Sequence, residues 1–352
     1  MHAALLNKIF RISKNPITLL AIAFLLAACQ GSRVPRQEVV VYTSVDQVYA
    51  EPVLQAFEEA SGIHVLPVYD VEATKTVGLA QRLLAEKGNP QADVFWSGEF
   101  TQTMFLNEQG ILAQYRTPTA TGLPSAYVDP DGYWYAFGGR ARVILVNTNL
   151  VRPGEEPASI YDLLAERYPG RQLGLANPLF GTTSTQAAAL YALNGADASR
   201  LFFQQVAERG VQVVDGNSVV RDMVADGQLA WGLTDSDDAC YELQKGAPVK
   251  VIFPDQAEGQ IGTLVTPNTV ALIANAPHPE NGQALVDYLL TPQAEALMVK
   301  LGWIQFPTRP LPQGLAPACF AGVSLRGMSP GLEEIYQYLA AALADMQEIF
   351  IR

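Results

Sequence analysis

The chain has 352 residues, of which 49% are hydrophobic, and its formal net charge is −12 at pH 7. The apolar content excludes a disordered polypeptide, and the acidity disfavours a nucleic-acid partner, which requires a basic surface. The length exceeds what a single hydrophobic core usually serves, so two lobes are expected.

The N-terminal segment predicts export. Lys8, Arg11 and Lys14 form a basic start, and an apolar run over residues 17–26 leads to Leu-Ala-Ala-Cys29. The run is short and ends in small residues, which is typical of a secretory signal. Because the cysteine follows small residues, the segment resembles a bacterial lipobox. An ordinary signal peptide and a membrane anchor helix are the alternatives.

In the lipobox interpretation, residues 1–28 are a signal peptide, Cys29 is acylated, and residues 29–38 form a tether. The mature protein would then be held at a membrane by its N-terminal lipid, facing the periplasm or the cell exterior. The sequence leaves open whether that membrane is the inner or the outer one.

Strand and helix patterns alternate after the tether, which indicates a parallel sheet covered by helices on both faces. Ligands of such sheets gather at the carboxyl ends of the strands. The candidate ligand-binding residues there are Thr43, Ser44, Glu72, Ser97 and Glu99. The expected strands cover residues 39–42, 63–69 and 92–96, and the expected helices cover 46–60, 76–87 and 99–109.

A second alternating set begins near residue 171, and the segment 279–352 is expected to be mostly helical. Two long apolar strands, over residues 140–147 and 262–273, lead from one set to the other and predict a two-strand hinge. The predicted fold class is therefore α/β, with two doubly wound mixed sheets joined by this hinge. Lobe 1 would comprise residues 39–140 and 264–311, and lobe 2 would comprise 141–263 and 312–352.

Two cysteines remain when Cys29 is assigned to lipidation. Cys240 and Cys319 permit one disulfide, and their spacing does not match a zinc site. The alternative, in which both cysteines are buried free thiols, fits the sequence equally well.

Five short motifs are spread over most of the chain, at residues 41–44 (VYTS), 91–97 (QADVFWS), 139–143 (GRARV), 176–178 (ANP) and 216–219 (GNSV). With these motifs in this order, nearly the whole chain resembles the solute-binding lipoproteins of bacterial ABC importers, which are type II periplasmic binding proteins of the extracellular solute-binding class. More narrowly, it resembles their ferric-binding branch. This resemblance implies two lobes that close over a small ligand and deliver it to a membrane permease. We expect the protein to be a monomer.

One side of the expected cleft has the chemistry of an anion site. Thr182, Thr183 and Ser184 precede an alanine-rich helix, and Asn217 and Ser218 open another. Helix starts offer backbone N–H groups and a favourable dipole to an anion. Arg140 could add a charged fork to a phosphate or carboxylate. Simple helix capping by the hydroxyls is the alternative.

The other side departs from the ferric-binding pattern. Iron-binding members of the family hold ferric ion with two adjacent tyrosines, and the matching positions here are Asp237 and Asp238. Many members place a histidine in the first loop, where this chain has Asp46. Loss of the tyrosine pair argues against tight iron binding. Tyr241, three residues further on, is expected to pack on the surface of the lobe.

Acids beside an anion pocket predict a ligand that carries both charges. Asp46, Asp237 and Asp238, with Glu72 or Glu99, would hold an ammonium group, and the helix starts would hold a phosphonate or phosphate. Asp235 is a further candidate ligand-binding residue. An aminoalkylphosphonate fits this description. Three alternatives remain open: the aspartates, Asp235 included, cap a helix; a hydrated divalent cation bridges the charges; or ferric iron binds at Asp46, Asp237 and Asp238.

An enzyme on this fold is the rival class, and the sequence gives it little support. The three histidines are His2, His64 and His278, and none belongs to a recognisable catalytic set or metal-ligand cluster. We therefore expect a binding protein that needs no cofactor.

Overall fold

The computed structural model describes residues 37–70 and 77–351, and Glu38–Arg352 form one compact unit. The predicted signal peptide, Cys29 and most of the tether lie outside the described residues, as does Glu72. Among the residues that are described, no helix is both long and apolar enough to span a membrane.

The first α/β set has the predicted parallel sheet. Strand β1 pairs in parallel with β2 on one side and with β3 on the other, so the carboxyl ends of all three strands lie at one edge. The elements are β1 (Glu38–Thr43), α3 (Gln47–Ser61), β2 (His64–Tyr69), α4 (Val77–Ala85), β3 (Val94–Ser97), α5 (Thr101–Glu108) and β4 (Leu112–Ala113).

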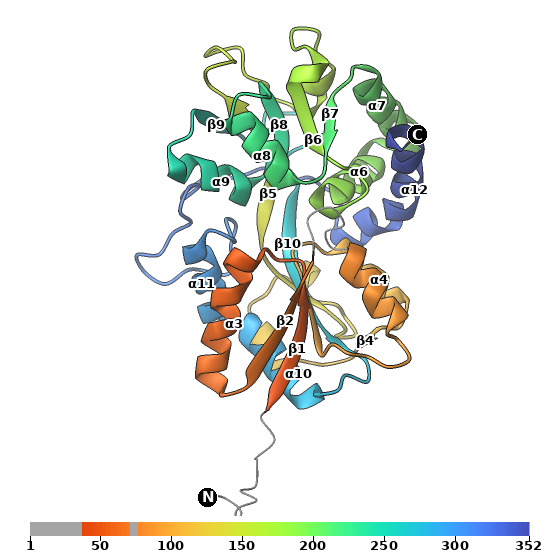
Figure 1. Ribbon diagram of the computed structural model, residues 1–352, viewed down its shortest axis with the longest axis vertical. Coiled ribbons are helices and arrows are strands. Elements are labelled where there is room, and N and C mark those ends of the chain that lie inside the picture. Colours follow the sequence, from red (N-terminus) through yellow and green to blue (C-terminus); the bar gives the residue numbers. More distant parts are fainter. Residues whose placement is uncertain (1–36, 71–76, 352) are drawn as a thin grey trace, which may run out of the picture. The chain divides into compact units, whose positions relative to one another are not determined.

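Two long strands connect the two sets, as Figure 1 shows. Strand β5 (Tyr135–Asn147) is buried along its whole length, and β10 (Val265–Ile273) pairs with its first half in antiparallel fashion. The second half of β5 pairs with β8 and β9, and β10 pairs with β3. Strand β5 therefore belongs to both sheets, and the predicted pair of connecting strands is present.

The second set repeats the alternation, with β6 parallel to β7 and to β8. Helix α6 follows β6, as the sequence predicts, and β8 ends at Asp235, next to the start of α9. The elements are β6 (Leu173–Ala176), α6 (Gly181–Asn194), α7 (Ala196–Glu208), β7 (Gln212–Val214), α8 (Asn217–Ala225), β8 (Trp231–Asp235), α9 (Ser236–Lys245) and β9 (Val249–Ile252).

The C-terminal part is helical only in portions. Helices α10 (Pro279–Leu289) and α11 (Pro292–Leu301) are followed by α12 (Leu332–Phe350), but residues 302–331 contain neither helix nor strand. The expectation of a mostly helical end was wrong there, because prolines at 307, 310, 312 and 317 interrupt helical hydrogen bonding. Short 3-10 turns occur at Pro118–Ala120, Ser125–Tyr127, Ile160–Leu164 and Gly170–Gln172.

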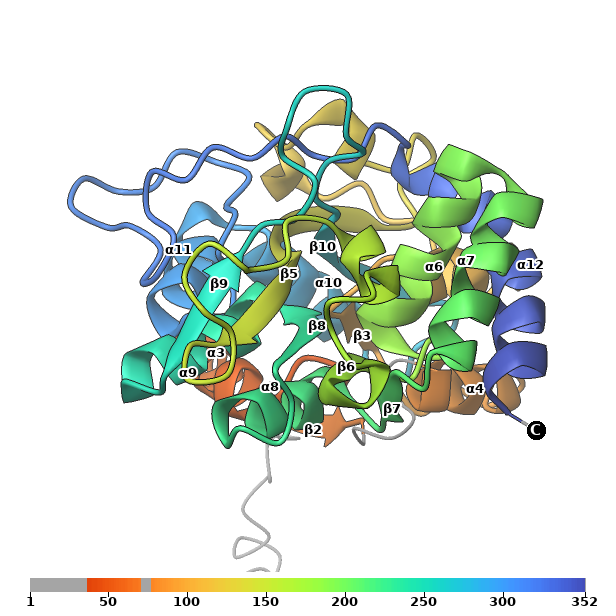
Figure 2. The ribbon, with the colours of Figure 1, turned by 90° about the horizontal axis from the view of Figure 1, so that it is seen from above.

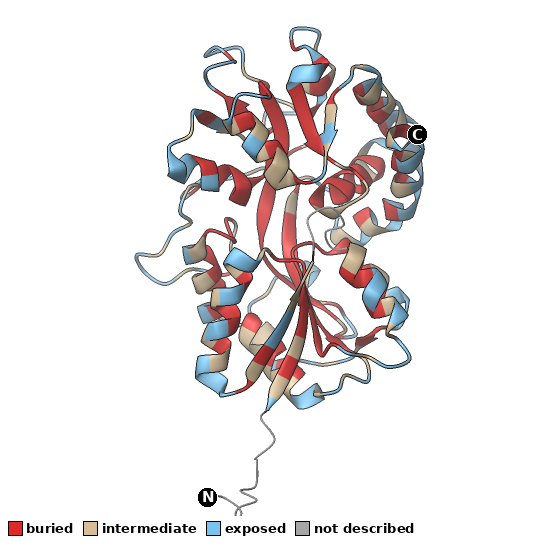
Figure 3. Cartoon of the chain, viewed as in Figure 1, coloured by how far each residue is buried: buried red, intermediate tan, exposed pale blue. Residues whose placement is uncertain are grey.

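Helix α12 packs against α6 and α7, and both views of the ribbon show the three helices side by side (Figures 1 and 2). Strands β3, β5, β6 and β8 and residues 182–191 of α6 are buried, whereas β2, β7 and the outer faces of α7 and α12 are partly exposed (Figure 3). The start of α6 is thus held inside the protein by helices on its outer side. This burial keeps its N-terminal turn rigidly placed next to the strand ends.

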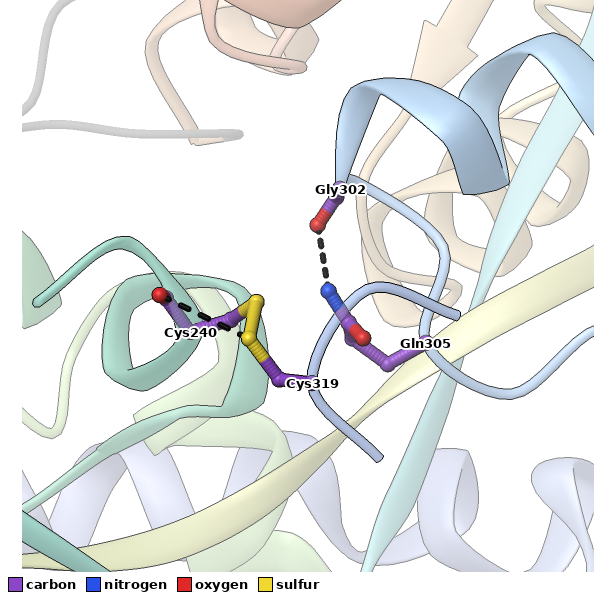
Figure 4. The surroundings of a disulfide bond; sticks show 4 residues. All are labelled: Cys240, Gly302, Gln305 and Cys319. Carbon is purple, nitrogen blue, oxygen red and sulfur yellow. Dashed lines mark hydrogen bonds between the residues drawn. A yellow bond between two sulfur atoms is a disulfide. The ribbon is translucent and has the colours of Figure 1, made fainter. Parts of the chain in front are cut away.

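Cys240 and Cys319 form a disulfide, which settles the alternative left open by the sequence (Figure 4). Cys240 lies in α9, and Cys319 lies in the irregular segment 302–331. The beginning of this segment pairs with β5 through Gly139 and Phe306. The disulfide therefore fastens the irregular segment to the helix that also carries Asp237 and Asp238.

Candidate functional site

A small cavity of about 30 Å³ lies where strand ends of the first set meet helix starts of the second. It has room for about two water molecules, so a larger solute enters only if the groups around it move apart. Most of the predicted site residues line it: Ser44, Asp46, Gly98, Glu99, Arg140, Gly181, Thr182, Asn217, Asp235, Asp237 and Asp238. Gly98 and Gly181 are the two lining residues outside the predicted set.

The other predicted residues that the structure describes are not among those that line the cavity. Ser97 is fully buried and its hydroxyl lies 3.3 Å from that of Ser44, and the hydroxyl of Thr43 accepts a hydrogen bond from Val45. Ser184 donates to the carbonyl of Gly181 within α6. Thr183 and Ser218 lie in the first turns of α6 and α8, so they shape the helix starts.

Two glycines shape the lining of the cavity, Gly98 through a close contact and Gly181 through its backbone conformation. A Cβ atom on Gly98 would lie 3.1 Å from the ring of Trp303 and 3.3 Å from Nη2 of Arg140. Gly181 begins α6 with a φ of 54°, in the left-handed region that other residues adopt only with strain. A side chain at either position would fill or distort the lining.

Arg142 is a residue that the sequence interpretation missed. It is fully buried, and its Nη1 donates to Asp235 at 2.8 Å, to Asn217 at 2.8 Å and to Thr182 at 3.2 Å. Alternation along a strand places residues 140 and 142 on one face, so the spacing of Arg140 and Arg142 could have revealed it. Burial alone raises the pKa of Asp235, but Arg142 and Arg140 outweigh burial and the pKa is lowered, so this carboxyl is ionised.

Arg140 is held from three directions. Its Nη1 lies 3.2 Å from Asp237, its Nη2 donates to the carbonyl of Gly98 at 2.9 Å, and its guanidinium stacks 3.9 Å from the ring centre of Trp303. Burial lowers the pKa of this guanidinium, but the carboxylates, Asp237 first, outweigh it, and the pKa is raised. Arg140 therefore stays charged and fixed in position.

Asp237 and Asp238 occupy the first turn of α9, as the capping alternative requires, but each also has an arginine partner. Asp238 contacts Arg221 at 3.0 Å and accepts a hydrogen bond from Thr234. The fold thus supplies these acids with arginine partners that sequence order could not reveal. That they also face a positive centre of the ligand stays a prediction. Burial, followed by Asp237 and Asp235, raises the pKa of Asp238.

Glu99 has a capping role. Its carboxylate accepts hydrogen bonds from the backbone of Thr101 and Gln102 at the start of α5 and from the hydroxyl of Thr185 in α6. Burial raises the pKa of Glu99. An ammonium group at Glu99 would have to compete with these donors for the carboxylate oxygens. As the structure stands, the carboxylate connects α5 of the first set to α6 of the second.

The aromatic residues near the acids do not replace the missing tyrosine pair. Tyr241 is 43% exposed and packs under Arg221 and Lys245 on the surface, as predicted. Burial and the nearby Asp237 and Asp238 raise the pKa of Tyr49, which disfavours its phenolate. Within the described part of the chain, three carboxylates lie close enough to share a metal ion, those of Asp235, Asp237 and Asp238. The predicted set had Asp46 as its third member, and this cluster has Asp235 instead.

The raised pKa of Asp238 predicts a pH dependence of stability. The folded chain binds a proton at this carboxyl more tightly than the unfolded chain, in which an aspartate has a pKa of about 3.9. We therefore expect the unfolding free energy of the wild type, relative to Asp238→Asn, to rise as pH falls from neutral toward about pH 4. Urea unfolding of both proteins over this range measures it. Asp226→Asn, at an exposed position, is the control, and a flat difference would contradict the prediction.

The fold and this site define a solute-binding protein, and comparison with known proteins gives the family. Residues 38–304 match the model of the bacterial extracellular solute-binding protein family, and the chain belongs to that family. Its members are non-enzymatic components of transport. The fold is that of the two-lobed type II periplasmic binding proteins, which confirms the predicted fold class.

Relatives with different ligands in their names resemble the chain about equally. A Salmonella typhimurium protein, provisionally named a 2-aminoethylphosphonate-binding periplasmic protein, is 22% identical, over 86% of this chain and 88% of its own length. Iron uptake protein A1 of Synechocystis is 24% identical, over 89% and 87%. The apo ferric ion-binding protein A of Pasteurella haemolytica superposes with a TM-score of 0.78 at 21% identity, covering 90% of this chain and all of that one.

A third kind of relative is the periplasmic binding protein AfuA of Actinobacillus pleuropneumoniae, solved with fructose-6-phosphate. It superposes with a TM-score of 0.79 at 20% identity, covering 90% of this chain and all of that one. At such identities the structural likeness establishes the fold, and the ligand must be argued from the site.

Proposed function

We propose that this protein captures a small zwitterionic solute with a phosphonate or phosphate group, such as an aminoalkylphosphonate, and delivers it to an ABC import permease. The observation that supports this proposal is that one cavity joins the start of α6 to the acids of α9. The receptor would act as a monomer held at the membrane through Cys29, with neither a cofactor nor a nucleic-acid partner.

The anionic group of the solute would bind at the start of α6. The first N–H groups of a helix have no partner within it, and the helix dipole favours negative charge there. Gly181 and Thr182 line the cavity at this point, and Arg140 lines it from β5. Arg140 also has a buried Nε without a hydrogen-bond partner among the described residues, so it has a donor to offer an incoming anion.

The cationic group would face the acids. Five carboxyl groups line the cavity, from Asp46, Glu99, Asp235, Asp237 and Asp238, whereas Arg140 is the only basic residue among the lining residues described. An anion without a positive charge of its own is repelled by this excess, whereas an ammonium group within reach of the acids compensates it. The name of the Salmonella relative agrees with a ligand of this kind.

Binding would involve closure of lobes made of residues 39–140 with 264–311 and 141–263 with 312–352, about β5 and β10. The small volume of the cavity supports such a motion, since an aminophosphonate is larger than two water molecules. Compaction on ligand addition, measured by small-angle scattering, tests this part of the proposal.

Calorimetry of the soluble chain with 2-aminoethylphosphonate and with inorganic phosphate tests the ligand class. We expect the aminophosphonate to bind, and Asp237→Asn with Asp238→Asn to weaken it at least tenfold without weakening the binding of phosphate. The reason is that only the aminophosphonate carries an ammonium group for these acids. Asp226→Asn, which removes an exposed acid, is the control. Equal losses for both ligands would contradict the zwitterion proposal.

Ferric iron is a second candidate, and the three close carboxylates of Asp235, Asp237 and Asp238 favour it. The guanidinium of Arg140 lies 3.2 Å from Asp237 and 3.7 Å from Asp235, and its positive charge would oppose a ferric ion between them. We expect ferric salts to give no tyrosinate colour and no binding that withstands citrate. A coloured, tight complex in the presence of citrate would restore iron as the ligand.

A further inference from the structure

The side-chain donors at the helix starts already hold an anion, and that anion is the carboxylate of Asp235. Its Oδ2 accepts hydrogen bonds from Thr182 at 2.7 Å and from Asn217 at 3.2 Å, and its Oδ1 accepts one from Arg142 at 2.8 Å. Asp235 is 2% exposed. The sequence had assigned Thr182 and Asn217 to the anion of the solute.

This position of Asp235 is not a by-product of helix capping. Asp235 occupies the N-cap position of α9, yet its side chain makes no capping hydrogen bond. Strand pairing explains where the side chain goes, because Arg142 on β5 lies directly opposite Asp235 on β8. Residues directly opposite in adjacent strands extend from the same face of the sheet. The carboxylate is thus directed to Arg142 and away from the helix that it precedes.

We propose that Asp235 determines specificity by occupying this anion subsite from within the protein. A solute anion placed against Thr182, Asn217 and Arg142 would have to share them with a buried negative charge, which is unfavourable where water is excluded. This part rests on the proposed function. The solute then carries a single anionic group, which binds at the start of α6 and at Arg140. Solutes with a second anionic group would be rejected.

Removal of Asp235 should convert the subsite into one for inorganic phosphate. In Asp235→Ala, the guanidinium of Arg142 loses its carboxylate while Thr182 and Asn217 become free to donate, and the missing side chain leaves space for an anion. We expect calorimetry to show phosphate binding at least tenfold tighter than in the wild type. Asp235→Asn, which keeps the size of the side chain, should gain much less.

Asp46→Ala is the matched control, because it removes a carboxyl group from the lining of the same cavity, whereas Thr182, Asn217 and Arg142 keep their bonds to Asp235. A gain confined to Asp235→Ala, and abolished by adding Arg142→Met, supports the assignment. An equal gain in Asp46→Ala would show that net charge alone is responsible and would overturn it, as would no gain in a variant whose circular dichroism is native.

The phosphate experiment is independent of the natural cargo. If Asp235→Ala gains phosphate binding but the wild type binds no zwitterion, the proposed function fails and the occupation of the subsite by Asp235 stands. If the wild type binds 2-aminoethylphosphonate but Asp235→Ala gains nothing, the proposed function stands and this inference fails.

Discussion

Arg142→Met is expected to lower the free energy of unfolding by about 3–5 kcal/mol, the usual cost of removing one partner from a buried ion pair. Arg142 is fully buried, and its loss leaves the ionised carboxylate of Asp235 in the protein interior with two neutral donors and a more distant Arg140. Urea unfolding of the variant and of the wild type measures the difference.

Two further variants establish the cause. Asp235→Asn added to Arg142→Met should recover a large part of the loss, since no uncompensated charge then remains. Arg167→Met removes an arginine whose partner Asp162 lies 3.4 Å away at the surface, and it should cost about 1 kcal/mol or less. A loss in Arg142→Met no larger than in Arg167→Met would contradict the role given to the buried pair.

Reduction of the Cys240–Cys319 disulfide is expected to lower the free energy of unfolding by about 4 kcal/mol. The bond closes a loop with a sequence separation of 79 residues, and the entropy that it removes from the unfolded chain corresponds to a value of that order. For a chain of this size, the melting temperature should fall by roughly 6 °C. Calorimetric scans with and without a reductant measure the effect.

The double variant Cys240→Ser with Cys319→Ser provides the control for the reductant. It should melt near the reduced wild type and should not respond to the reductant. Because Cys240 lies one turn beyond Asp237 in α9, we also expect reduction to weaken solute binding. An unchanged melting temperature after verified reduction would show that the segment around Cys319 is held by its other contacts, such as the pairing of Gly139 with Phe306.

The local sequence pattern was sufficient to predict most helices and strands and the edge of the sheet where the cavity lies. The alternation of short apolar runs with helical segments predicted the parallel strands β1, β2 and β3, and their carboxyl ends carry Ser44 and Glu99, which line the cavity. The starts of α6 and α8 were predicted near Thr182 and Asn217 from the hydroxyl and amide residues there, although α6 begins at Gly181 and so includes Thr182, Thr183 and Ser184. Periodicity and end signals act over a few residues, so sequence alone reveals them.

These local signals could not predict which charged residues form ion pairs at the site. Arg142 and Asp235 are far apart in the chain and meet only because β5 and β8 pair in one register. The same holds for Arg140 with Asp237 and for Cys240 with Cys319. The sequence by itself thus determined the fold class and the kinds of groups around the cavity. Only the tertiary structure decided which charges neutralise each other, because that depends on strand register and helix packing between distant segments.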